Sequence, residues 1–148
     1  MTSQIDEIGL TYKSSLPTDE MVTIQCPEDA YNLLLKIWDM DTIQIKEEFL
    51  LILLNHDKKC LGWSKISSGG STATIVDVAA IFQILLIGNA HSFIISHNHP
   101  SGTLKPSSSD IALTRRIADA GKIMGVPLDD HIIITNETYT SMRQKGLC

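Results

Sequence analysis

Two histidines and an aspartate, His97, His99 and Asp110, have the residue types and the spacing of a metal-binding site. Side chains of a strand alternate between its two faces, so the imidazoles of His97 and His99 point to one side and Asn98 points to the other. A structural zinc site usually closes all four positions with protein ligands, whereas two imidazoles and one carboxylate leave a fourth position for water. The three residues therefore predict a catalytic zinc site.

Each part of this pattern also has an ordinary structural interpretation. Ser107 and Asp110 have the spacing of a capping box, in which the serine caps a helix and the acid three residues later reaches back to it. A single histidine in a strand is more often a hydrogen-bonded structural residue than a metal ligand. The combination of both histidines with the carboxylate, separated by the chain-breaking Pro100 and Gly102, favours the metal site.

The neighbouring residues predict the elements that position this site. Residues 91–96 form an apolar, β-branched run that predicts a buried strand, which Pro100 and Gly102 end just after the histidines. A helix is expected to begin after Ser107, with Asp110 in its first turn and an apolar face made by Ile111, Ile117, Ala118 and Met124.

The pattern His-x-His, ten intervening residues and Asp, with Ser three positions before the Asp, resembles the JAMM motif of the MPN metalloprotease family. The fuller string from His97 to Gly102, followed by Pro106, Ser107 and Asp110, resembles the RadC-type branch. The likeness covers residues 40–148 and includes further matches in segments 114–116, 120–121, 128–133, 139–141 and 145–147. It implies a zinc ion held by His97, His99 and Asp110, a glutamate on an earlier strand that hydrogen-bonds the zinc-bound water, and an oxyanion-stabilising role for Ser107.

The candidates for that glutamate are Glu47 and Glu48, at the start of an apolar run that predicts a central strand. The family pattern places an acid two residues before the aromatic residue, which selects Glu47, and strand alternation points Glu48 to the opposite face. Glu47 would take a proton from the water during attack and return it to the leaving amine. The alternative is that both acids are solvated residues that precede a buried strand.

His131, beside Asp130, has two interpretations. It is either a relay to the metal or a structural residue. The structural role is favoured, because the ligand set is complete without it and a buried histidine usually finds a carboxylate.

The expected elements follow the order helix, hairpin, helix, strand, helix, hairpin. They are a helix from Pro27, strands at 48–54 and 60–66, a helix at 78–87, the strand at 91–96, the helix after Ser107, and a final hairpin from His131 to Met142. The sequence thus predicts one α/β domain over residues 1–148, a three-layer mixed β-sheet flanked by helices, in agreement with the MPN/JAB (cytidine-deaminase-like) fold. Residues 1–27 are expected to form an extended lead-in with an edge strand around residues 5–13, and no helix-hairpin-helix region is expected before it.

Composition narrows the functional classes. The chain of 148 residues is 43% hydrophobic, which suits a domain with a sizeable core. Its net charge of -5 argues against strong nucleic-acid binding, which depends on Lys and Arg. A zinc deaminase is disfavoured because its Pro-Cys-x-x-Cys signature is missing from the sequence.

The sequence has no apolar run of about 18 residues that would predict a membrane span, and no basic-then-apolar leader that would predict secretion. Its three cysteines form no Cys-x-x-Cys pair. A cytoplasmic protein is therefore expected. The predicted function is a zinc-dependent hydrolase of the JAMM type that cleaves a peptide, amide or isopeptide bond in a peptide or protein substrate. The alternatives are a non-catalytic, zinc-stabilised binding module and a DNA-repair-associated protein.

Overall fold

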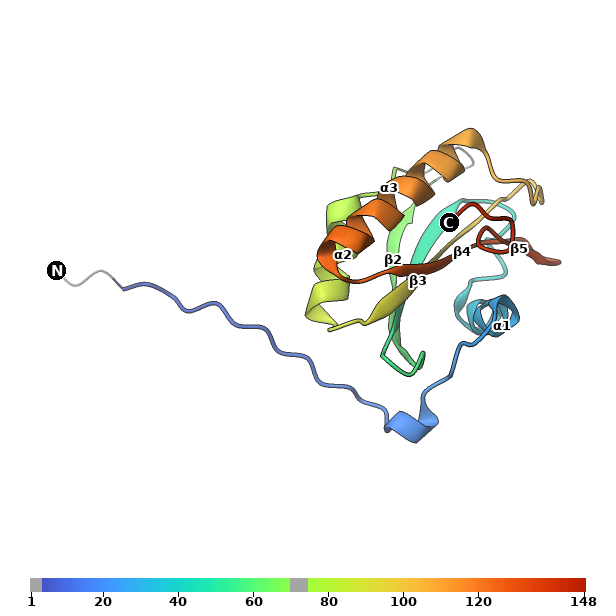
Figure 1. Cartoon of the computed structure of the whole chain (residues 1–148). Coiled ribbons are helices and arrows are strands. Elements are labelled where there is room, and N and C mark those ends of the chain that lie inside the picture. The colour runs from blue at the N-terminus through green and yellow to red at the C-terminus, as the bar shows by residue number, and fades with distance from the viewer. Residues whose placement is uncertain (1–3, 70–74) are drawn as a thin grey trace.

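The centre of the computed structural model, which describes residues 4–69 and 75–148, is a mixed sheet of five strands in the order β2-β1-β3-β4-β5 (Figure 1). β3 and β4 are parallel, and the other neighbouring pairs are antiparallel. The strands span Glu48–Leu54 (β1), Cys60–Ser68 (β2), Ser92–Asn98 (β3), Leu128–Ile134 (β4) and Tyr139–Ser141 (β5). The predicted mixed sheet and the predicted order of elements are confirmed.

Helices cover both faces of this sheet, which explains why all seven residues of β1 and of β3 are buried (Figure 1). α1 (Pro27–Ile37) lies on one face with a core cluster that includes Leu50, Ile52 and Ile94. α2 (Val78–Ile87) and α3 (Ser108–Met124) lie on the other face, over a cluster that includes Phe49, Leu51 and Phe93. The predicted three-layer architecture is therefore confirmed.

The N-terminal segment differs from its prediction. Residues 5–13 form no strand, and Ile5 and Ile8 are 91% and 92% exposed. After a short 3-10 helix, η1 (Thr18–Glu20), an isolated bridge between Thr23 and Lys59 joins the chain to the edge of the sheet, with a hydrogen bond from the Cys60 amide to the Val22 carbonyl oxygen. Alternating apolar residues satisfy the local pattern of a strand, but a strand also needs a partner along its edge.

Two helices are less completely buried than their sequences suggest. The last two residues of α2, Leu86 and Ile87, are 42% and 50% exposed. In α3 the buried residues are Thr114, Ile117 and Gly121, whereas Met124 is 44% exposed. The buried face of α3 therefore includes a threonine, whose hydroxyl lies in the core beside the histidines described below.

Over the described parts of the chain, no helix combines the length and the hydropathy needed to span a membrane.

Candidate metal centre

His97 and His99 lie at the carboxyl end of β3 on the face that α3 covers. His97 is the penultimate residue of the strand, pairs with Phe49 of β1 and stacks on its ring with 6.2 Å between centroids. His99 follows the strand, and its Nε2 atom lies 2.9 Å from Nε2 of His97. The expected orientation of both imidazoles to one side is what the structure shows.

Asp110 reaches the same two atoms from the first turn of α3. Its Oδ1 lies 3.3 Å from Nε2 of His97, and its Oδ2 lies 3.2 Å from Nε2 of His99. The sequence of the turn dictates this placement, because Ser107 is the N-cap and Asp110 is the third helical residue. The structure thus brings the three predicted ligands, His97, His99 and Asp110, together.

The capping box that we considered as an alternative is present, and it is compatible with a metal site. The Asp110 amide donates to Oγ of Ser107 at 3.0 Å, and the Ser107 amide donates to Oδ2 of Asp110 at 2.8 Å. These two hydrogen bonds fix the carboxylate at the start of the helix while leaving both of its oxygens in reach of the histidines. Capping therefore orients Asp110 rather than competing with the site.

The electrostatics of the cluster favour a cation. Burial acts to raise the pKa of the Asp110 carboxyl, but the imidazoles of His97 and His99, which contact its two oxygens, outweigh burial and hold that pKa well below its ordinary value of 3.8. The hydrogen bond to Asp110 raises the pKa of the His99 imidazole above its ordinary value of 6.5, although burial opposes this rise. A carboxylate that stays ionised and draws a proton onto its neighbour marks a place where positive charge is stabilised.

The orientation of His99 also fits a metal ligand. Its Nδ1 lies 2.6 Å from the backbone carbonyl oxygen of Thr103. A carbonyl oxygen only accepts hydrogen bonds, so the proton of the neutral ring must sit on Nδ1 and the lone pair on Nε2. That lone pair faces His97 and Asp110, as zinc coordination by two imidazole nitrogens and a carboxylate oxygen requires.

Glu47 borders the same site from the residue just before β1. Its carboxylate and the ring nitrogens of His97 and His99 lie within 4.8 Å of one another. These three residues are therefore themselves a possible ligand group, and Asp110 approaches the same imidazoles. Glu48 lies on the opposite face, as expected, where it is 2% exposed and paired with Lys65.

The side chain of Asn98 fixes the backbone on both sides of Glu47. Asn98 is fully buried, and its Nδ2 donates to the carbonyl oxygens of Ile43 at 2.6 Å and Lys46 at 2.9 Å. Its Oδ1 accepts a hydrogen bond from the Glu48 amide at 2.7 Å. The residue between the two histidines thus holds the segment that carries Glu47. The sequence indicated only that Asn98 points away from them.

His131 contacts other groups than the carboxylate that we expected. Its Nε2 lies 2.7 Å from Nδ1 of His97, and its Nδ1 lies 2.7 Å from Oγ1 of Thr114. Asp130 accepts a hydrogen bond from the His131 backbone amide instead. His131 therefore touches a predicted metal ligand directly, and no spacing rule in the sequence joins these residues across β3, β4 and α3.

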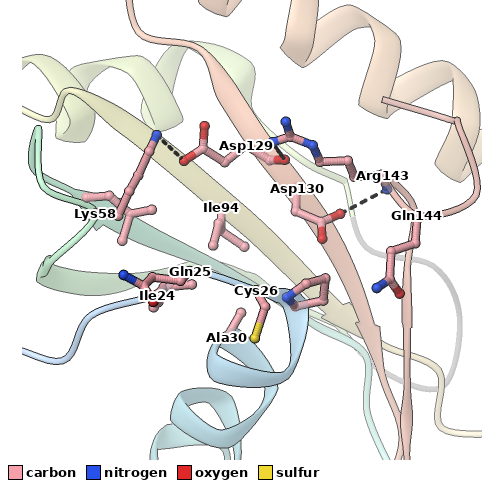
Figure 2. Close-up of a pocket in the computed structure, with 12 residues that line it drawn as sticks. Ile24, Gln25, Cys26, Ala30, Lys58, Ile94, Asp129, Asp130, Arg143 and Gln144 are labelled. Atoms are coloured by element: carbon pink, nitrogen blue, oxygen red, sulfur yellow. Dashed lines mark hydrogen bonds and ion pairs between the residues drawn. The ribbon is translucent and has the colours of Figure 1, made fainter.

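The site opens into a cavity of about 470 Å³ that contains Glu47, Ser107 and the three predicted ligands. A larger cavity of about 630 Å³ lies on the α1 face of the sheet and contains none of these residues (Figure 2). Its charged groups have partners: Lys58 pairs with Asp129, the Arg143 guanidinium donates to the Asp129 carbonyl oxygen, and the Arg143 backbone amide donates to the Asp130 carboxylate. The chemistry predicted from the sequence thus belongs to the smaller cavity.

Comparison with known proteins gives a consistent result. Residues 24–147 match the RadC-like JAB domain family. A UPF0758 protein of Desulforamulus reducens is 38% identical over 135 residues, which are 90% of this chain and 58% of that protein. A UPF0758 protein of Salinibacter ruber is 35% identical over 95% of this chain and 59% of its own length. The UPF0758 protein lmo1549 of Listeria monocytogenes is 38% identical over 94% of this chain and 61% of its own length. The chain spans about three-fifths of the length of these curated relatives.

Proposed function

Because the chain belongs to the RadC-like JAB domain family, we propose that it is a zinc-dependent hydrolase of the JAMM type, acting on a peptide, amide or isopeptide bond. The observation that carries the proposal is the convergence of Nε2 of His97, Nε2 of His99 and the Asp110 carboxylate, with 2.9 to 3.3 Å between neighbouring atoms. These three side chains would hold the metal. Zinc in such a site lowers the pKa of a bound water to about 7 and polarises a substrate carbonyl.

Glu47 is the proposed general base and acid. It is half-buried, lies within 4.8 Å of the ligand nitrogens, and is held by the Asn98 hydrogen bonds to the residues on either side of it. A carboxylate in that position accepts the proton of the attacking water and transfers it to the leaving amine, so that the expelled group departs neutral.

Ser107 is the proposed oxyanion donor. Its Oγ accepts a hydrogen bond from the Asp110 amide and keeps its own proton for donation. Ser107 also lines the cavity together with Glu47 and the histidines. A donor aimed at the developing oxyanion stabilises the transition state, and removal of one such donor typically costs about a hundredfold or more in rate.

The wall of the cavity supports a peptide-like substrate. Apolar side chains of Phe49, Val76 and Leu113 line it beside the hydroxyls of Ser101, Ser107 and Ser109. A peptide presents the same mixture of apolar side chains and hydrogen-bonding amides. We therefore propose a peptide or protein substrate. The net charge of -5 gives no support to a nucleic-acid substrate.

The test combines metal content with turnover. We expect protein loaded with zinc and then desalted to retain one equivalent of zinc by mass spectrometry, and to cleave members of a fluorescence-quenched random peptide library. His97→Ala should lose both properties, whereas Glu47→Gln should keep the zinc and lose the cleavage. The exposed pair His56 and His91, with 3.3 Å between Nδ1 of His56 and Nε2 of His91, provides the matched control. His56→Ala should change neither zinc content nor cleavage.

Two results would contradict parts of this proposal. Substoichiometric zinc that is insensitive to His97→Ala would refute the metal site. One tightly held equivalent without cleavage of peptides or of isopeptide-linked protein conjugates would instead favour the non-catalytic, zinc-stabilised binding module.

A further inference from the structure

A chain of buried hydrogen bonds runs from His97 away from the proposed metal. Nδ1 of His97 contacts Nε2 of His131 at 2.7 Å, and Nδ1 of His131 contacts Oγ1 of Thr114 at 2.7 Å. Oγ1 of Thr114 in turn lies 2.6 Å from the carbonyl oxygen of Asp110, one helical turn earlier in α3. His131 and Thr114 are fully buried, and His97 is 3% exposed. None of these contacts is needed to complete the proposed ligand set.

The carbonyl at the far end sets the direction of every hydrogen bond in this chain. A carbonyl oxygen has no proton, so the hydroxyl proton of Thr114 points at Asp110, and the sulfur of Met142, 3.5 Å from the same hydroxyl, is likewise only an acceptor. The Thr114 oxygen is then an acceptor toward His131, which places the His131 proton on Nδ1 and leaves a lone pair on its Nε2. That lone pair can only accept a proton from Nδ1 of His97.

We infer that His131 and Thr114 are positioning residues that hold His97 as its Nδ1–H tautomer and so direct the Nε2 lone pair toward the metal. This inference rests on the proposed function for the identity of the bound group, whereas the tautomer itself is a property of the metal-free protein. His99 reaches the same state by a shorter route, since the Thr103 carbonyl accepts from its Nδ1 directly.

The alternative arrangement shows why a fixed direction matters. If the chain ran the other way, the Nε2 proton of His97 would point at Oδ1 of Asp110, 3.3 Å away, and no lone pair would face the site. The Asp110 carboxylate and the Nε2 lone pair of His99, which lies 2.9 Å from Nε2 of His97, both favour that reversed tautomer, so the buried chain opposes two real competitors. Since the links are buried, water is poorly placed to replace a lost one.

Thr114→Val and Thr114→Ser form the matched test, because valine keeps the size of threonine and removes the hydroxyl, whereas serine keeps the hydroxyl. We expect imidazole ¹⁵N spectra of the metal-free wild type and of Thr114→Ser, recorded at about pH 9 where imidazoles are neutral, to show His97 protonated on Nδ1. Thr114→Val should give a mixture of tautomers. Loss of such a supporting contact typically weakens metal affinity by about 10- to 100-fold, and we expect a loss of that size for Thr114→Val in competition with a chromophoric chelator.

His131→Gln gives a second route if Thr114→Val does not fold. A side-chain amide can turn to donate or to accept, so it supports both tautomers of His97 and should also produce a mixture. A merely structural role for Thr114 would lower the melting temperature of Thr114→Val while leaving the tautomer unchanged, and that result overturns the inference.

A wild-type protein in which His97 carries its proton on Nε2 overturns it as well. Failure of the proposed function has a different signature. The wild type then binds no zinc, while the tautomer measurement on metal-free protein still decides the direction of the chain.

Discussion

Replacement of Asn98 by alanine should destabilise the protein strongly, although it removes no apolar core side chain. Asn98 is fully buried, and its side chain makes three hydrogen bonds of 2.6, 2.7 and 2.9 Å to backbone groups of Ile43, Glu48 and Lys46. A typical intramolecular hydrogen bond contributes about 1 kcal/mol, and a buried group left without a partner costs about 1 to 3 kcal/mol. We therefore expect Asn98→Ala to lower the free energy of unfolding by about 3 to 5 kcal/mol.

Ser96→Ala is the matched control for this measurement. Ser96 lies two residues earlier on the same face of β3, is fully buried, and makes one hydrogen bond, to the Ile132 carbonyl oxygen at 2.7 Å. Its loss should cost about 1 kcal/mol. Urea unfolding of the metal-free proteins, followed by circular dichroism, gives both values on one scale. Equal losses in the two variants would refute the idea that Asn98 holds the segment at residues 43–48.

The same replacement should separate metal binding from turnover. The proposed ligands His97, His99 and Asp110 keep their contacts with His131, Thr103 and Ser107, respectively, in Asn98→Ala. Glu47, in contrast, loses the support of its two neighbours. Peptide cleavage should therefore fall by a larger factor than zinc affinity. A proportional loss of both would show that Asn98 supports the histidines themselves.

Three further predictions concern the proposed metal ligands and the N-cap of α3. Zinc affinity, measured by titration calorimetry, should be constant above the raised pKa of His99, because the imidazole is then neutral. Below that pKa the affinity should fall by up to about tenfold per pH unit for each proton that zinc displaces. In metal-free protein, the hydrogen bond that raises the pKa of His99 contributes stability that is fully present below pH 6.5 and is lost as the pH rises through the raised pKa. Chemical denaturation should therefore show a decrease in the free energy of unfolding over this window. Ser107→Ala should lose about 1 kcal/mol of stability with its N-cap and most of the turnover, whereas Ser107→Asp should keep the cap and the stability and still lose the turnover.

The sequence predicted most of the fold because the decisive patterns are local. The bounds of β1 follow from an unbroken apolar run between Glu48 and Asn55, and α1 begins at Pro27 as predicted. The alternation of side chains in a strand correctly separated Glu47 from Glu48. The same rule failed for residues 5–13, because alternation describes a strand without providing the neighbour that it must pair with.

The site could be predicted only as far as its motif extends along the chain. His97, His99 and Asp110 lie within 14 consecutive residues, so their spacing carries the information. The supporting contacts depend on the tertiary arrangement: Asn98 reaches Ile43 across 55 positions, and His97 reaches His131 across 34. Thr114 falls on the buried face of α3, where a sequence pattern of apolar residues gives no reason to expect a hydroxyl.

The alternation within His97-Asn98-His99 has a consequence for protein engineering. Consecutive side chains of this tripeptide point to opposite faces of the sheet. A fragment that keeps only the sheet and α3 would therefore retain the two imidazoles and Asp110, but it would lose the carbonyl groups before β1 to which Asn98 donates. Transplantation of the centre into another scaffold would therefore have to carry a segment equivalent to residues 43–48 along with the histidines.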